Sequence, residues 1–209
     1  MRKNRRWQVA IVVMLVLLSV SGCQAVEPEK RAYPLVVGID WEEGDYQVWM
    51  DLASLGKDTG QEKQGGEEQN TQILCFTGKN QEEILHAYEA SQERYLDIGH
   101  VKAVLLGEEL IRQQEQLGKV LDGMEKENIL GNSAYVFATP MVEGVMETDG
   151  KEVESLGEFL SGMYENRTGE EKREPVRMAD LYRERQEERA VMCPQVTAVE
   201  GQLKVEWVD

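Results

Sequence analysis

The chain has 209 residues, of which 41% are hydrophobic and 30% are charged, and its formal net charge is −16 at pH 7. This apolar content is enough for a folded core and excludes a disordered acidic tail. The negative charge also argues against nucleic acid and anionic lipid as partners of the protein surface, because both carry charge of the same sign.

The N-terminus is typical of a bacterial export signal. An apolar run from Val9 to Leu18 precedes the first acidic residue, Glu27, and follows four basic residues: Arg2, Lys3, Arg5 and Arg6. A helix needs about 20 apolar residues to cross a bilayer core, and this run has only ten. We therefore expect residues 1–22 to be a signal peptide that is removed.

The segment Val20-Ser21-Gly22-Cys23 looks like a lipobox, in which an apolar residue and two small residues directly precede a cysteine. This pattern predicts cleavage between Gly22 and Cys23 and a diacylglyceryl group on the Cys23 thiol, since two acyl chains hold a protein stably on a membrane. An ordinary secretory signal with an incidental cysteine is the alternative. The mature chain would have 187 residues, which suits one domain, and a net charge of 19 − 39 = −20.

The first part of the mature chain reads as a tether followed by a hairpin. We expect residues 23–33 to form a polar tether and residues 34–209 to form a single domain. Within residues 35–53, an apolar run is followed by a stretch in which apolar residues alternate with Gln47, Trp49 and Asp51, which predicts a buried strand and a half-buried partner. Residues 56–70 contain no apolar residue and four glycines, which indicates a surface loop.

The middle of the chain predicts strands that alternate with helices. Residues 73–76 read as a strand, and Asn80 followed by Glu83 is typical of a helix start. Residues 101–106 are uniformly apolar except for one lysine and predict a central strand. One long amphipathic helix is predicted next by six apolar residues at helical spacing: Leu110, Ile111, Leu117, Val120, Leu121 and Met124.

The last third predicts further elements of both kinds. Residues 134–138 read as a strand, and Ser155 with Glu158 marks another helix start. Residues 178–189 are expected to form a short, mostly solvated helix, and residues 191–207 a closing hairpin. Because hairpins lie at both ends of the alternating pattern, we predict an α/β domain of the α+β type, with a mixed β-sheet and flanking helices.

The sequence predicts no catalytic, metal or cofactor site. His86 and His100 are the only histidines, and their surroundings lack metal-ligand spacing; we expect a structural, hydrogen-bonding role for His100. Cys75 and Cys193 could form a disulfide in an extracytoplasmic compartment. Both also lie in apolar, strand-like surroundings, where a free cysteine behaves as a small buried hydrophobic residue.

Several separated segments, taken in order, resemble the N-terminal domain of the spore germinant-receptor C-subunit lipoproteins, the Ger(x)C family. The lipobox is followed by Gly38-Ile39-Asp40, and later by residues 99–109, which read Gly-His-Val-Lys-Ala-Val-Leu-Leu-Gly-Glu-Glu. The strand at residues 132–138 follows the long helix in the same order. The resemblance covers residues 23–207.

The resemblance implies a non-enzymatic subunit on the extracytoplasmic face of the inner spore membrane. It would be held in the bilayer by acylated Cys23 and would sense nutrients together with an integral subunit and a transporter-like subunit. Family members commonly carry Trp-Asp where this chain has Gln24-Ala25, and they usually continue into further domains after the position of Trp207. An accessory role therefore stays open, and a lipid-anchored solute-binding protein is the alternative function.

Overall fold

The computed structural model describes residues 27–53, 72–127, 129–148, 155–169, 173–187, 189 and 192–207. The predicted signal peptide, Cys23 and the predicted loop at 56–70 lie outside these residues. The contacts divide the chain into two units between Lys30 and Arg31. The described part of the first unit contains the short 3-10 helix η1 (Pro28–Lys30). The second unit is the folded domain.

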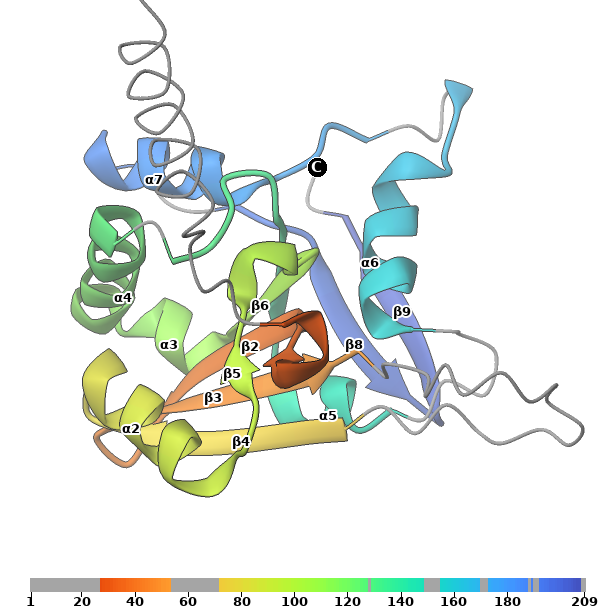
Figure 1. Ribbon diagram of the computed structural model, residues 1–209. Coiled ribbons are helices and arrows are strands. Elements are labelled where there is room, and N and C mark those ends of the chain that lie inside the picture. Colours follow the sequence, from red (N-terminus) through yellow and green to blue (C-terminus); the bar gives the residue numbers. More distant parts are fainter. Residues whose placement is uncertain are drawn as a thin grey trace, which may run out of the picture. The chain divides into compact units, whose positions relative to one another are not determined.

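Seven strands of the domain form one mixed sheet in the order β4-β3-β2-β6-β7-β8-β9 (Figure 1). Strands β2, β6, β7 and β8 are parallel neighbours, whereas β3, β4 and β9 pair antiparallel. This confirms the predicted α/β domain with a mixed sheet and a hairpin at each end of the sequence. The strands are β2 (Pro34–Glu42), β3 (Asp45–Leu52), β4 (Gln72–Gly78), β6 (Ala103–Gly107), β7 (Tyr135–Thr139), β8 (Gln195–Val199) and β9 (Gln202–Glu206).

Both hairpins have the two-residue turns that match the twist of antiparallel strands. Glu43 and Gly44 connect β2 to β3 with φ values of 52° and 99°, and Glu200 and Gly201 connect β8 to β9 with φ values of 51° and 77°. Such turns require positive φ at both central residues, which glycine adopts at little cost. Glycine at the second position therefore lets each hairpin close tightly.

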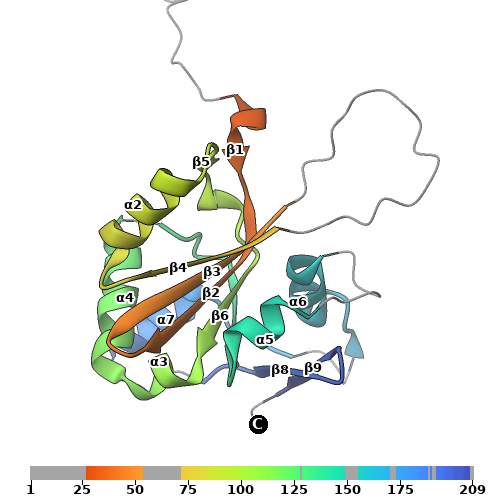
Figure 2. The same ribbon diagram turned by 90° about the horizontal axis from the view of Figure 1, so that it is seen from below.

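The helices cover the two faces of the sheet separately (Figure 2). Helices α2, α3, α4 and α7 pack on one face, and α5 and α6 pack on the other. The central strand β6 is buried at all five positions, with Leu105 0% exposed, which confirms the predicted central strand. The helices are α2 (Gln81–Ser91), α3 (Glu108–Arg112), α4 (Gln114–Glu127), α5 (Val142–Met146), α6 (Leu156–Glu165) and α7 (Met178–Gln186).

One helix prediction was wrong. The single helix predicted across residues 110–124 is two helices, α3 and α4, which break at Gln113 with φ −88° and ψ 70°. Apolar residues keep helical spacing across the break, so spacing does not reveal it. The short, mostly solvated helix predicted at residues 178–189 is present as α7, which buries only Met178, Leu181 and Tyr182 of its nine residues.

Candidate functional site

Two of the sequence segments that carry the family resemblance meet at the carboxyl ends of β2 and β6. These strands are parallel, with Ile39 opposite Leu106, so Asp40 lies beside Gly107. Asp40 Oδ1 accepts hydrogen bonds from the backbone N–H of Leu110 at 3.0 Å and of Trp41 at 2.8 Å. Gly107 is the N-cap residue of α3 and has no side chain to bond the helix. Asp40 therefore satisfies the helix start from a neighbouring strand.

Gly38 and Gly107 must be glycines, because side chains of neighbouring elements approach their backbone closely. A Cβ atom on Gly107 would lie 1.9 Å from Asp40 Cγ, and a Cβ atom on Gly38 would lie 2.3 Å from Val142 Cγ1 of α5. Burial raises the pKa of Asp40, although the two backbone hydrogen bonds oppose this effect. Gly38, Asp40 and Gly107 thus hold strands and helices together.

A second cluster fixes the start of the domain. Strand β1 (Arg31–Ala32), which lies in the predicted tether, pairs in parallel with β5 (Tyr95–Leu96). The Asp97 carboxylate accepts a hydrogen bond from Arg31 at 2.5 Å and another from the backbone N–H of Gly99 at 3.1 Å. The Asp97 backbone N–H also donates to the Ala32 carbonyl at 2.9 Å. The hydrogen bond from Arg31 is the largest of the effects that lower the pKa of Asp97.

The two histidines lie apart from each other on the surface. His100 follows Ile98 and Gly99 in the 3-10 helix η2 (Ile98–His100), and its side chain is 65% exposed. Its Nδ1 atom is 3.8 Å from Asp97 Oδ1, and its ring packs edge-on against Tyr33 with 5.1 Å between ring centroids. His86 is exposed on α2. Residues 97–100 therefore contact the first residues of the domain.

The structure does not bring Cys75 and Cys193 together, and both are free. Cys75 is exposed on β4, and Cys193 is buried just before β8. Four strands, β3, β2, β6 and β7, lie between β4 and β8 in the sheet. Burial, with a smaller contribution from Glu184, raises the pKa of Cys193 to about 12, so its thiol is protonated at neutral pH.

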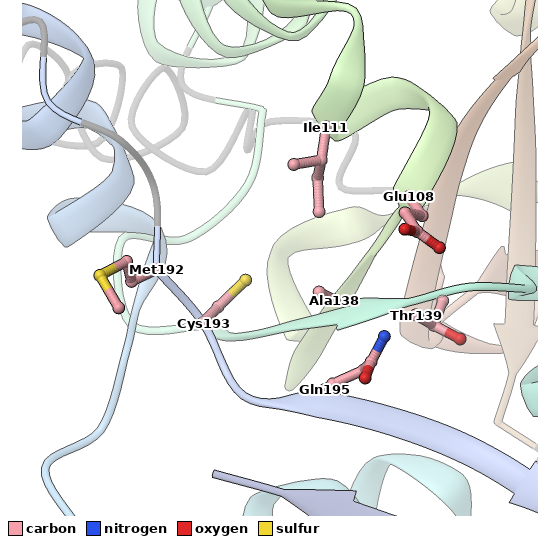
Figure 3. A pocket seen from close by; sticks show the side chains of 7 residues that line it. All are labelled: Glu108, Ile111, Ala138, Thr139, Met192, Cys193 and Gln195. Carbon is pink, nitrogen blue, oxygen red and sulfur yellow. The ribbon is translucent and has the colours of Figure 1, made fainter. Parts of the chain in front are cut away.

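A pocket of about 300 Å³ lies at the carboxyl ends of β6 and β7 (Figure 3). The chain continues from β6 into α3 on one face of the sheet and from β7 into α5 on the other. Crevices at such divergence points commonly bind ligands in α/β proteins. The pocket is lined by Glu108, Ile111, Ala138, Thr139, Met192, Cys193 and Gln195.

Two polar side chains of the pocket, those of Glu108 and Thr139, bond to neighbours in their own segments. Figure 3 shows Ile111 and Cys193 pointing toward each other across it. Glu108 forms an ion pair with Arg112 at 2.5 Å, and the Thr139 hydroxyl donates to the Met141 carbonyl at 3.2 Å. Among the described residues, no cluster of three metal-ligating side chains occurs. None of the helices described could span a membrane either. The sequence does not reveal this pocket, because its lining comes from three distant segments.

Asp51 is a buried acidic residue, although the alternating pattern of its strand predicts it on the exposed side. Its side chain lies on β3, the residue is 2% exposed, and neither carboxylate oxygen has a hydrogen-bond partner among the described residues. Trp49, on the same side of the strand, is 8% exposed. Strand β3 is therefore buried on both faces over its second half. Burial raises the pKa of Asp51 to about 6.

Comparison with known proteins gives one family and no individual relative. The family of the spore germination protein N-terminal domain matches residues 24–198. No curated protein and no solved structure matches the chain. The matched range contains both segments that meet at Asp40 and Gly107. It also contains Asp97 and its hydrogen-bond partners Arg31 and Gly99. It covers most of the 209 residues. The chain therefore belongs to the family of the spore germination protein N-terminal domain.

Proposed function

We propose that this chain is a lipid-anchored subunit, or an accessory protein, of a spore nutrient-germinant receptor. A role in spore germination follows from the family. The observation that carries the finer proposal is the position of the family match, which begins at residue 24, directly after the lipobox cysteine Cys23. A domain that starts immediately after a lipidated residue works at a membrane surface.

The proposed partners are the integral and transporter-like receptor subunits in the inner spore membrane, together with the bilayer through acylated Cys23. The mature chain would carry a net charge of −20, which anionic lipid repels within a Debye length of about 8 Å at physiological salt. Lipid anchoring on the extracytoplasmic face would hold the domain against this repulsion. Its partners would then be recognised by specific protein contacts.

We propose that the protein acts by protein–protein interaction and not by catalysis. This is supported by the roles of Gly38, Asp40 and Gly107, which make packing and capping contacts. A lipid-anchored solute-binding protein is the second candidate, favoured only by the pocket beside β7. That pocket, at about 300 Å³, is at the lower end of the range for ligand sites.

Lipid anchoring is tested by Cys23→Ala, with Cys75→Ala as the matched control. The Cys23 variant should stay an uncleaved or mislocalised precursor, whereas the Cys75 variant should partition into detergent as the parent protein does. A Cys23→Ala protein that is still mature and membrane-held would refute the anchor.

The role in germination is tested by deleting the gene. Deletion should slow or abolish nutrient-triggered germination and leave vegetative growth unchanged. A copy of the gene that carries His100→Ala should restore most of the germination response to the deletion strain. Unchanged germination across a broad nutrient panel would contradict the receptor role. Heating the purified protein with the same nutrients tests the solute-binding alternative, because a ligand at 100 times its Kd adds about 2.7 kcal/mol of stability.

A further inference from the structure

The connection between the proposed anchor and the folded domain is short. Arg31, where the domain begins, lies eight residues after Cys23. Eight residues span at most about 29 Å, whatever their conformation. The domain from Arg31 to Asp209 has 209 − 30 = 179 residues, and a compact domain of that size is about 40 Å across. The end of the domain opposite Arg31 therefore cannot be turned toward a bilayer that holds Cys23.

Arg31 lies at the amino end of the parallel strands. It belongs to β1, which leads into β2, and the partner strand β5 is followed by η2 and then by β6. We call residues 31–33 and 93–102 the amino end of the domain. Residues 42–45 and 108–112 follow the carboxyl ends of β2 and β6, and we call them the carboxyl end. Figure 2 shows β1 and β5 far from α3, at opposite ends of the domain.

The two ends differ in charge. The amino end has three basic residues, Arg31, Arg94 and Lys102, and two acidic residues, Glu93 and Asp97. The carboxyl end has five acidic residues and one basic residue: Glu42, Glu43, Asp45, Glu108, Glu109 and Arg112. The negative charge of the whole chain is therefore not shared by its amino end. An anionic bilayer repels the carboxyl end and turns it outward.

The amino end also presents an exposed aromatic ring. Tyr95 lies opposite Arg31 in the pair of β1 and β5, and it is 62% exposed. Tyrosine is enriched at the interface between membrane and water, because its ring is apolar and its hydroxyl group stays hydrated. The hydrogen bond from Arg31 to Asp97 and the pairing of β1 with β5 hold this ring close to the point where the chain enters the domain.

We propose that the amino end of the domain faces the bilayer, with the Tyr95 ring at the level of the lipid headgroups, and that the carboxyl end points away from the membrane. The reach of the connection, the charge of the two ends and the exposed ring all favour this orientation. Its attachment point rests on the proposed lipid anchor at Cys23. The pocket lined by Glu108 and Thr139 lies at the carboxyl end, so this orientation leaves it on the side open to other proteins.

Fluorescence quenching tests this orientation. Mature lipidated protein is placed in phosphatidylcholine vesicles that contain a lipid with a spin label on its headgroup. Glu93→Cys and Glu43→Cys, each combined with Cys75→Ser, carry a fluorophore at the amino end or at the carboxyl end. Each variant replaces one exposed glutamate, and the remaining Cys193 is buried.

The label at residue 93 should be quenched at least roughly threefold more strongly than the label at residue 43, because the domain is about 40 Å across. The ratio should rise when anionic phosphatidylglycerol is added to the vesicles and fall again with salt. Equal quenching at the two positions, or stronger quenching at residue 43, would overturn the orientation.

A second pair of variants tests the contact of Tyr95. Tyr95→Ser should lower the quenching at residue 93 roughly twofold, because the ring no longer holds this end at the headgroups. Val199→Ser is the control, since Val199 is 53% exposed at the end of β8, and it should leave the quenching unchanged. Melting temperatures check that both variants are folded. An unchanged signal in Tyr95→Ser would show that Tyr95 is not in the headgroup layer.

The anchor and the orientation can fail separately. Sedimentation of the vesicles shows whether the lipidated protein is bound, and unbound protein would refute the anchor. The orientation is then measured with a polyhistidine tag in place of residues 24–29 and with vesicles that contain a nickel-chelating lipid. This attachment does not lengthen the connection to Arg31. Equal quenching at residues 93 and 43 in the tagged protein would overturn the orientation by itself.

Discussion

Replacing Asp51 with asparagine is expected to stabilise the domain at neutral pH. The residue is 2% exposed, and neither carboxylate oxygen accepts a hydrogen bond from the part of the chain that the structure describes. Burial raises the pKa of this carboxyl group from its ordinary value of 3.8 to about 6. Ionisation is therefore harder in the folded state than in the unfolded state. Asparagine has nearly the same shape and cannot ionise, so the variant removes this penalty.

The size of the effect follows from the difference between the two pKa values. The shift from 3.8 to about 6 is worth roughly 3 kcal/mol, at about 1.4 kcal/mol for each pKa unit. The folded state is not penalised well below pH 3.8, loses stability as the pH rises from there to about 6, and keeps the full penalty above that. Asp51→Asn should thus gain about 3 kcal/mol at pH 7.5 but only about 0.5 kcal/mol at pH 4.

Urea unfolding of both proteins at pH 7.5 and pH 4 measures these differences directly. In thermal unfolding, the gain at pH 7.5 should raise Tm by about 6–12 °C, at roughly 2–4 °C per kcal/mol for a chain of this size. Glu89→Gln, on the exposed side of α2, is the control and should change stability by less than about 0.5 kcal/mol. Equal stability of Asp51→Asn and its parent at pH 7.5, or the same gain at both pH values, would refute this reasoning.

Three further substitutions, two of them with a matched control, test other contacts of the domain by the same unfolding assay. Leu105→Ala should cost roughly 2–5 kcal/mol, whereas Lys102→Ala should cost less than about 1 kcal/mol because its ion pair is exposed; equal, small effects would contradict a central strand. Gly107→Ala should cost about 1–3 kcal/mol by displacing the carboxylate that caps α3. Gly123→Ala in α4, where a Cβ atom would make only an ordinary contact with Gln81 at 3.8 Å, should be neutral or stabilising. Asp97→Asn should destabilise at pH 7, and its cost should shrink as the pH falls through the lowered folded pKa of Asp97.

The sequence alone determined the features that depend on residues close together in the chain. Asn80 and Ser155 accept hydrogen bonds from the backbone N–H groups of Glu83 and Glu158, as their spacing predicts for helix starts. The closing turn at Glu200 has the positive φ that its glycine neighbour indicates. The central strand was predicted from its continuous apolar run, because a strand buried on both faces needs apolar residues at nearly every position.

Only the tertiary structure decided which distant residues meet and which surfaces are covered. Alternation in β3 predicts two different sides but not what packs on them, so the burial of Asp51 was not predicted. The break at Gln113 separates α3, whose start is capped by Asp40 of β2, from α4. The place of β4 at the edge of the described sheet likewise depends on strand order. Strand order arises from long-range packing, and spacing within one segment carries no record of the neighbour that segment acquires.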